Sequence, residues 1–394
     1  MAIACERSKA TAQIKSCLPP AFLCDSPRPM QKLLVAALFF AALHAHSADE
    51  EIDKAAITGA YTRAPYRNKT FEPAGEPSPL KVKESLADTD KEIAGLAESV
   101  FRSSPHNLGM MLIDKNQIIY ERYAEGLDEK TKYFSYSMGK SLTAYAVGQA
   151  YCGGSIASLD DKAVAYSKNL EGTVFGDASV KQLLTMSSGA PAPFEAGGSA
   201  KGEWRSVTRQ TATIEQVLRS YGNTAVEQRP FEYNNSNTNA LMYVLNGAGG
   251  FHKIFDEKIW QAAKPKSQGA WLIDKNDDAY AAAGFSATLS DWGRLSTFVL
   301  NMRSGKEGAC IEKFMKDATS SQIKVGKGYF GYDYGYQTWI YTRQPSSRFT
   351  WRGAFGQTVA FDPVKERVLI IFRHRSGFVL EAIGGLMARW ERMP

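Results

Sequence analysis

The sequence predicts a mixed α/β fold of the α+β type, in which an antiparallel sheet is flanked by helices and carries an inserted helical subdomain. Three observations support this prediction. Short apolar runs typical of strands occur at 107–114 and 117–124, and similar runs return after residue 328. The segment between them, about 155–300, has mostly helical and loop-like patterns. Strands from both ends of the domain can therefore build one sheet around a helical insertion.

The first 48 residues are predicted to be a leader that is removed from the folded protein. Met30, Gln31 and Lys32 precede an apolar run over 33–43, and small residues at 45–48 fit a cleavage site. This is the layout of a secretory signal peptide over 30–48, and its apolar run is too short to span a bilayer as a helix. Residues 1–29 are then upstream sequence or a long positive region. We expect a periplasmic or secreted protein without a membrane span after processing.

Charge and cysteine content narrow the class of protein. The chain has 394 residues, 44% of them hydrophobic, with 47 Lys+Arg against 41 Asp+Glu. This composition excludes a disordered or collagen-like protein, and the excess charge of +6 is too small and too scattered to indicate a nucleic-acid partner.

After loss of the leader, Cys152 and Cys310 are the remaining cysteines. An oxidising compartment would permit them to pair, but two buried free thiols are an equally common arrangement.

The remaining elements follow in chain order. Residues 49–80 are polar and proline-rich, which indicates an extended arm or linker before the domain at 81–394. Helical spacing predicts an amphipathic helix over 81–101, and the two apolar runs after it predict a β-hairpin. Further elements are a helix over 137–151, strands over 328–341, 347–361 and 367–372, and a closing helix over 378–389.

The first chemical motif is Ser137-Met138-Gly139-Lys140 at the start of a predicted helix. Positions three apart in a helix share a face, so the lysine can accept the serine proton while the helix N-terminus favours negative charge. Two other Ser-x-x-Lys matches, at 78–81 and 321–324, do not open a helix behind a strand. A phosphate-binding loop is excluded because Phe134 occupies the position of its first glycine.

Two further motifs carry groups that can do chemistry. Tyr233 and Asn235 precede a helix, where a phenol could shuttle a proton and an amide could orient substrate or lysine; a polar turn that caps the helix is the simpler interpretation. Trp351-Arg352-Gly353 lies on a late strand, where a glycine marks either a bulge or a close approach of backbone or ligand. The scattered histidines and remaining cysteines have no metal-ligand spacing.

These motifs and their flanks together resemble the serine β-lactamase and penicillin-binding-protein superfamily. The chain is most similar to the branch with class C β-lactamases, serine esterases and 6-aminohexanoate-dimer (nylon-oligomer) hydrolases. The flanks that carry the resemblance are Ser158-Leu159-Asp160-Asp161, the segments 180–189 and 283–291, and Gly356-Gln357 followed by Phe361-Asp362-Pro363. The resemblance extends from about Ser104 to the C-terminus and implies a β-lactamase/transpeptidase-like fold.

The resemblance also implies roles for individual residues. Ser137 matches the acylated nucleophile, Lys140 its partner in proton transfer, Tyr233 the general base and acid, and Asn235 the asparagine that closes the second motif. The amide groups of Ser137 and Ala354 match the oxyanion hole. Trp351-Arg352-Gly353 falls where many relatives have Lys-Thr-Gly, so we retain all three residues as candidates for substrate positioning.

The predicted function is hydrolysis of a small-molecule ester or amide through an acyl-enzyme, with no metal or organic cofactor required. Because relatives use the lysine and threonine of Lys-Thr-Gly to hold the carboxylate of a β-lactam or D-alanyl peptide, their replacement makes such substrates less suitable. Two alternatives remain: a β-lactamase or D,D-peptidase of the same fold, and a catalytically silent binding or regulatory homologue.

Overall fold

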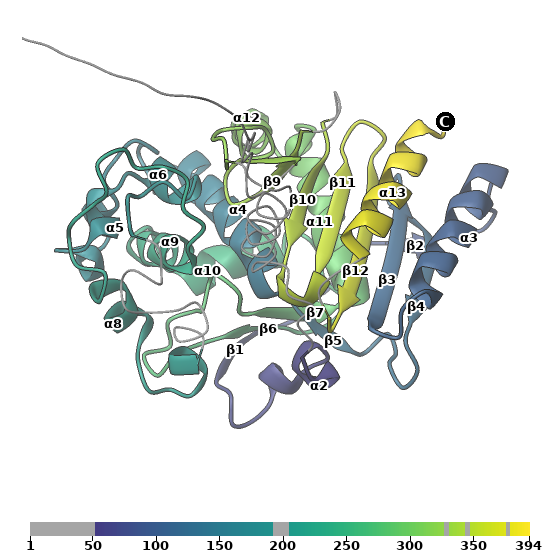
Figure 1. The fold of residues 1–394 in the computed structure, drawn as a ribbon, viewed down its shortest axis with the longest axis horizontal. Coiled ribbons are helices and arrows are strands. Elements are labelled where there is room, and N and C mark those ends of the chain that lie inside the picture. Colours follow the sequence, from purple (N-terminus) through teal and green to yellow (C-terminus); the bar gives the residue numbers. More distant parts are fainter. Residues whose placement is uncertain (1–51, 192–204, 327–330, 343–346, 376–378) are drawn as a thin grey trace, which may run out of the picture. The chain divides into compact units, whose positions relative to one another are not determined.

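Two β-sheets organise the protein, which is described here from a computed structural model (Figure 1). The described residues are 52–191, 205–326, 331–342, 347–375 and 379–394, and all belong to one unit, Ser47–Pro394. The larger sheet has eight strands in the order β2-β4-β3-β12-β11-β10-β9-β8. Its strands are β2 (Lys81–Val82), β3 (Asn107–Asp114), β4 (Gln117–Tyr123), β8 (Tyr332–Tyr334), β9 (Trp339–Tyr341), β10 (Phe349–Arg352), β11 (Thr358–Asp362) and β12 (Arg367–Arg373). Neighbouring strands are antiparallel except β2 and β4, which are parallel. The sheet contains strands from both ends of the domain, as the sequence predicts.

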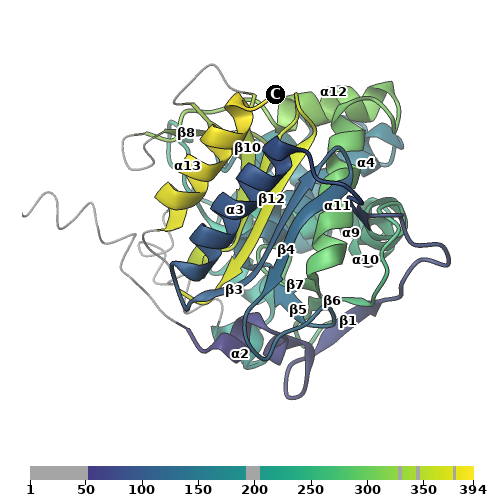
Figure 2. The ribbon, with the colours of Figure 1, turned by 90° about the vertical axis from the view of Figure 1, so that its right-hand side faces the viewer.

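Helices cover both faces of this sheet, and the sheet separates two apolar cores. The outer face carries α3 (Asp88–Arg102) and α13 (Val379–Arg392), which lie side by side in Figure 2. Their apolar residues pack against Met110, Leu112 and Leu369. The inner face carries α4 (Gly139–Cys152) and α11 (Leu289–Arg303), which belong to the larger core. The alternating side chains of β3 and β12 thus serve both cores, which explains their continuous apolar sequence.

The helical region lies beside the inner face and contains most of the remaining helices. They are α5 (Val174–Asp177), α6 (Val180–Leu184), α8 (Ile214–Arg219), α9 (Asn235–Gly247), α10 (Phe251–Phe255), α12 (Ala309–Ala318) and the short helices η3 (Ala163–Ala165), η4 (Lys168–Leu170) and η5 (Asp256–Trp260). The centre of this region is α9, whose residues from Ser236 to Leu245 are all buried. It packs against α4 and so holds the second predicted motif against the first.

The predicted hairpin over 107–124 is confirmed. Lys115 and Asn116 link β3 to β4, and their φ angles are 47° and 64°. Two consecutive left-handed residues form the tight turn that matches the twist of antiparallel strands. The predicted helix over 137–151 is also confirmed, since α4 ends at Cys152 before Gly153 and Gly154.

Other predicted boundaries differ from the structure. The segment predicted as a helix from residue 81 begins with β2, and α3 starts only at Asp88, where Asp90 accepts a hydrogen bond from the Ala87 amide. Late in the chain, the structure has five strands where three were predicted. The range 328–341 contains β8 and β9, and the range 347–361 contains β10, the turn η6 (Ala354–Gly356) and β11. The sequence pattern did not predict these internal breaks, although glycine, proline and polar residues usually mark such positions.

A second sheet was absent from the prediction. It contains β1 (Asn68–Phe71), β6 (Gly269–Leu272), β7 (Phe285–Thr288) and β5 (Lys132–Phe134), in the order β1-β6-β7-β5. Two of its strands lie inside the region predicted to be helical. Another lies within the predicted extended arm, together with α2 (Lys54–Ile57) and η1 (Ala60–Thr62). The arm is therefore folded onto the domain over 54–71, where Ile57 and Phe71 are buried.

Cys152 and Cys310 form a disulfide, so the open choice between pairing and free thiols is decided for pairing. The bond joins the end of α4 to the start of α12. No helix in the described part of the chain is long and apolar enough to cross a membrane. The predicted leader, residues 1–48, lies outside the described residues.

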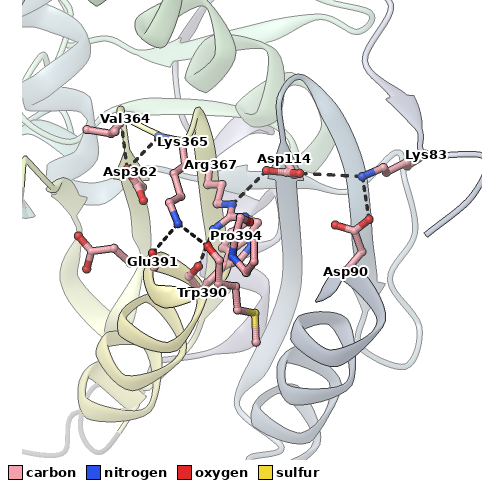
Figure 3. Close-up of polar contacts among 11 residues, drawn as sticks. Lys83, Asp90, Asp114, Asp362, Val364, Lys365, Arg367, Trp390, Glu391 and Pro394 are labelled. Atoms are coloured by element: carbon pink, nitrogen blue, oxygen red, sulfur yellow. Dashed lines mark hydrogen bonds and ion pairs between the residues drawn. The ribbon is translucent and has the colours of Figure 1, made fainter. Parts of the chain in front are cut away.

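A chain of charged groups fastens α13 to the sheet (Figure 3). Arg367 on β12 forms a buried ion pair with Asp114 on β3 at 3.1 Å, and it donates to the carbonyl oxygens of Trp390, Met393 and Pro394. Lys83 lies 4.0 Å from Asp114 and 2.7 Å from Asp90. Cations at the end of a helix satisfy its last carbonyl groups, so this network fixes the C-terminal end of α13.

We expect Arg367→Met to lower the free energy of unfolding by about 3–5 kcal/mol, because the buried carboxylate of Asp114 loses its guanidinium partner. Urea denaturation followed by circular dichroism measures the effect. The control is Arg389→Met, which removes the exposed ion pair between α13 and Glu92 and should cost about 1 kcal/mol or less. Equal losses in the two variants would contradict the proposed importance of the buried network.

Candidate active site

Ser137 lies in the short turn η2 (Tyr136–Met138) between β5 and α4. The position of this turn is fixed by Ser135, whose hydroxyl donates to the Ala283 carbonyl at 3.1 Å and accepts from the Phe285 amide at 3.1 Å. These bonds attach the turn to the start of β7. Ser137 is half-buried, whereas its neighbours Tyr136 and Met138 are buried. The serine is therefore the residue of this turn that remains accessible to a small molecule.

Lys140 is buried, with 1% of its surface exposed, and its amine has three acceptors. Nζ donates to Ser137 Oγ at 2.8 Å, to Asn235 Oδ1 at 2.7 Å and to the Ala282 carbonyl at 3.0 Å. A lysine ammonium has three N–H donors, so this environment uses all of them and fixes the amine beside the serine. A serine bonded to such an amine can pass its proton to it once the amine is neutral.

The second motif supplies both a helix cap and a ligand for the lysine. Asn234 is the N-cap of α9, and its side chain accepts from the Ser236 amide at 2.9 Å. The cap orients the next residue, Asn235, toward α4. The Asn235 amide nitrogen donates to the hydroxyl of Tyr280 at 3.2 Å while its oxygen accepts from Lys140. Asn234 thus caps the helix, while the adjacent Asn235 holds the lysine amine.

Tyr233 lies beside Lys140 in a small aromatic cluster. Lys140 Nζ is 5.1 Å from the centre of the Tyr233 ring. The ring packs against Trp339 at 5.4 Å and Tyr334 at 6.2 Å between centroids, and this cluster is separate from the main core. Tyr336, which follows β8 in the chain, packs elsewhere, against Phe314 in the middle of α12.

The third motif is divided between two faces of β10, as strand alternation predicts. Trp351 is fully buried on the inner face, where its indole donates to the Tyr145 hydroxyl at 2.9 Å. The ring is part of the core and presents no surface to a small molecule, so the role of Trp351 in substrate positioning stays a prediction that its burial does not favour. Arg352 is on the other face, with its guanidinium carbon 4.9 Å from the Tyr332 ring and 5.9 Å from the Trp339 ring.

Gly353 brings the end of β10 against the serine turn. A Cβ atom at this position would lie 2.5 Å from the Ser135 carbonyl oxygen, so no side chain fits there. The interpretation of this glycine as a close backbone approach is confirmed. Ala354 follows in η6 and is exposed. In addition, β9 pairs with Phe349 and Thr350 but not with the following residues of β10, so the strand edge beside the motif has no partner in β9.

Two tyrosines close to Ser137 in the chain, Tyr136 and Tyr145, are unsuitable as acceptors of the serine proton. Burial raises the pKa of Tyr136 well above its usual value. Burial also raises the pKa of Tyr145 to about 12, despite the opposing effect of hydrogen bonds with Thr338 and Trp351. Both phenols therefore stay neutral near pH 7.

In the described part of the chain, no group of three or more His, Cys, Asp or Glu side chains could hold a metal ion.

Sequence analysis used 283–291 only as a flank of the resemblance and did not predict that 279–284 forms one wall of the lysine site. It supplies the Ala282 carbonyl to Lys140 and the Ala281 carbonyl to Thr143, and the Ala282 amide donates to Asn239. The available signal was its run of small residues, Ala281-Ala282-Ala283-Gly284, which permits close approach of another backbone. Without knowledge of β7, nothing in the sequence placed this run beside α4.

We expect Tyr280→Phe to lower kcat about 3- to 30-fold with little change in KM, because Asn235 loses the acceptor that sets its amide orientation. Tyr280 acts through Asn235 and does not need to touch substrate. Steady-state kinetics on an activated ester, with the pH profile of kcat, measures this effect. Tyr243→Phe is the control, because Tyr243 is also buried and bonded by its hydroxyl, but to Asp278. A tenfold loss in the control as well would assign the effect to general destabilisation.

The fold, with a half-buried Ser137 bonded to the buried Lys140, indicates the class of serine hydrolases. The sequence profile described as "Beta-lactamase" matches residues 90–384. The chain therefore belongs to the beta-lactamase family and has its β-lactamase/transpeptidase-like fold, as predicted. A comparison with curated proteins finds no match.

Solved structures agree on the fold. A candidate 6-aminohexanoate-dimer hydrolase from Bacillus anthracis superposes with a TM-score of 0.71 at 19% identity, over 88% of this chain and 100% of its own. A penicillin-binding protein from Bacillus halodurans gives 0.60 at 15% identity, over 74% and 98%. EstCE1, a hydrolase with promiscuous acyltransferase activity, gives 0.59 at 13% identity, over 77% and 98%.

Proposed function

We propose that this protein is a serine hydrolase that cleaves carboxylic esters or amides through an acyl-enzyme on Ser137. The observation that carries the proposal is the hydrogen bond of 2.8 Å between Ser137 Oγ and the buried amine of Lys140. Asn235 and the Ala282 carbonyl hold that amine in place. An amine fixed in this way needs no reorganisation at the moment of reaction.

In the proposed mechanism, Lys140 or Tyr233 accepts the Ser137 proton as Oγ attacks the substrate carbonyl. The amide groups of Ser137 and Ala354 stabilise the oxyanion, which is consistent with the contact of Gly353 with the serine turn. The proton passes to the leaving group, and the C–O or C–N bond breaks. Water then attacks the acyl-enzyme in the same way and restores Ser137. All of these steps use groups of the chain and water.

The choice of substrate class rests on the third motif. Relatives with Lys-Thr-Gly carry a lysine where this chain has the buried Trp351. No cation can be presented from that position, so we expect linear esters and amides to be better substrates than β-lactams. The candidate dimer hydrolase and EstCE1 among the structural neighbours support this choice. The penicillin-binding protein keeps the β-lactamase or D,D-peptidase alternative open to test.

A fluorophosphonate probe and a substrate panel test the proposal. We expect a mass adduct on the peptide that contains Ser137, and turnover of p-nitrophenyl esters or linear amides above that of nitrocefin. Rapid nitrocefin turnover would favour the β-lactamase alternative. Absence of both adduct and turnover would favour the catalytically silent homologue.

We further propose that the protein acts outside the cytoplasm, after cleavage of the leader near residue 48. The disulfide between Cys152 and Cys310 supports this, because such bonds persist in oxidising compartments. N-terminal sequencing of the protein recovered from the periplasmic and extracellular fractions tests it. Recovery of an unprocessed chain from the cytoplasm alone would contradict it.

A further inference from the structure

A hollow lies between α13 and the outer face of the large sheet, on the side of β10 that carries Arg352. It is open to solvent, and the empty space of about 450 Å³ along its walls includes that solvent. Its sheet side includes Tyr332, Arg352 and Thr358, and its helix side includes Ile383, Gly384 and Met387. Figure 2 shows α13 lying across these strands. A Cβ atom on Gly384 would meet nothing within 4 Å, so the helix leaves room above the strands here.

The charged side chains that line the hollow are all positive. Among the described residues that line it, there are two arginines and no acidic side chain. Arg348 is neutralised, since it pairs with Glu391 at 3.2 Å and stacks on Tyr341 at 4.3 Å. Arg352 instead has aromatic neighbours, the rings of Tyr332 and Trp339. Aromatic rings accommodate a guanidinium face but leave its N–H edge available for a carboxylate.

The hollow adjoins the catalytic residues through Trp339. This ring contacts both the Arg352 guanidinium and the Tyr233 ring, and Tyr233 lies beside Lys140. Arg352 is also next to Gly353, which touches the serine turn. A linear molecule with its carbonyl at Ser137 would reach Arg352 along the end of β10, beside Trp339.

We infer that this hollow is a substrate subsite, and that Arg352 in it selects acyl chains that end in a carboxylate. The inference rests on the proposed function and specifies its substrate class: linear esters or amides with an apolar chain between the scissile carbonyl and a distal carboxylate. The apolar residues Ile383 and Met387 suit the chain, and Arg352 with the Thr358 hydroxyl suits the anion.

Two esters with acyl chains of equal length test the inference: mono-p-nitrophenyl glutarate, which ends in a carboxylate, and p-nitrophenyl pentanoate, which does not. In the wild-type protein we expect kcat/KM to be higher for the glutarate ester. In Arg352→Leu this preference should fall about 10- to 100-fold, mainly through KM, because a charge-assisted hydrogen bond is lost. Arg352→Lys should recover part of it. Gly384→Leu, which fills the hollow, should weaken binding of both esters.

The matched control is Lys324→Leu, which removes an exposed cation paired with Asp333, next to Tyr332 in β8. It should keep the wild-type preference. An unchanged preference in Arg352→Leu, with both activities still dependent on Ser137, would overturn the subsite and leave the hydrolase intact.

Binding without turnover provides a second readout. Hexanoate should raise the thermal midpoint of the wild-type protein more than hexanamide does, and Arg352→Leu should remove that difference. If neither ester is hydrolysed, the proposed function fails, and this measurement still decides whether Arg352 binds a carboxylate.

Discussion

Ser137→Ala is expected to lower kcat for an activated ester by about 10³-fold or more and to abolish the fluorophosphonate adduct. The hydroxyl is the group bonded to Lys140, and removal of a nucleophile leaves only the binding and oxyanion contributions to the rate. The half-buried serine contributes little packing, so the free energy of unfolding should change by less than about 1 kcal/mol.

The chain offers a matched control in the Ser-x-x-Lys sequence at 321–324. Ser321 and Lys324 both bind the Asp333 carboxylate in the middle of β8 and not the Ser137 site. Ser321→Ala should therefore keep wild-type kcat. Equal losses of activity in the two serine variants would contradict the assignment of the nucleophile.

Lys140→Met is expected to reduce kcat by about 10³-fold or more, because no amine remains to accept the serine proton. It should also lower the free energy of unfolding by about 1–3 kcal/mol, since Asn235 Oδ1 and the Ala282 carbonyl lose their donor. The measurements are single-turnover acylation and urea denaturation.

Lys140→Arg separates proton transfer from charge. A guanidinium keeps a positive charge beside Ser137 but does not give up a proton near neutral pH. We expect this variant to be as inactive as Lys140→Met. Substantial activity in Lys140→Arg would show that the residue acts by its charge alone, and the proposed proton transfer would then be wrong.

The elements that the sequence predicts well depend on local patterns. The tight turn at Lys115 and Asn116 and the helix that begins after Ser137 follow from apolar spacing and from residues that end or reverse the chain. The strands of the second sheet were missed for the opposite reason. β6 and β7 have only four residues each and are buried throughout; Gly269–Leu272 shows no alternation of apolar and polar side chains, and the alternation over Phe285–Thr288 is too short to identify a strand.

The candidate site shows the same division. Motif order and resemblance indicated Ser137, Lys140, Tyr233 and Asn235, and the structure brings all four together. Tyr280 and Ala282 could not be predicted, because their contacts with Asn235 and Lys140 depend on how β6 and β7 return the chain to α4.

By itself, the sequence determined that Ser137 and Lys140 share one side of a turn and that Trp351 and Arg352 point to opposite faces of a strand. Both follow from the periodicity of helix and strand, which is a local property of the backbone. Only the tertiary structure decided which face of β10 became core, which placed Trp351 against Tyr145 and Arg352 at the hollow under α13. That choice depends on which surfaces bury apolar area together, and such contacts join residues far apart in the chain.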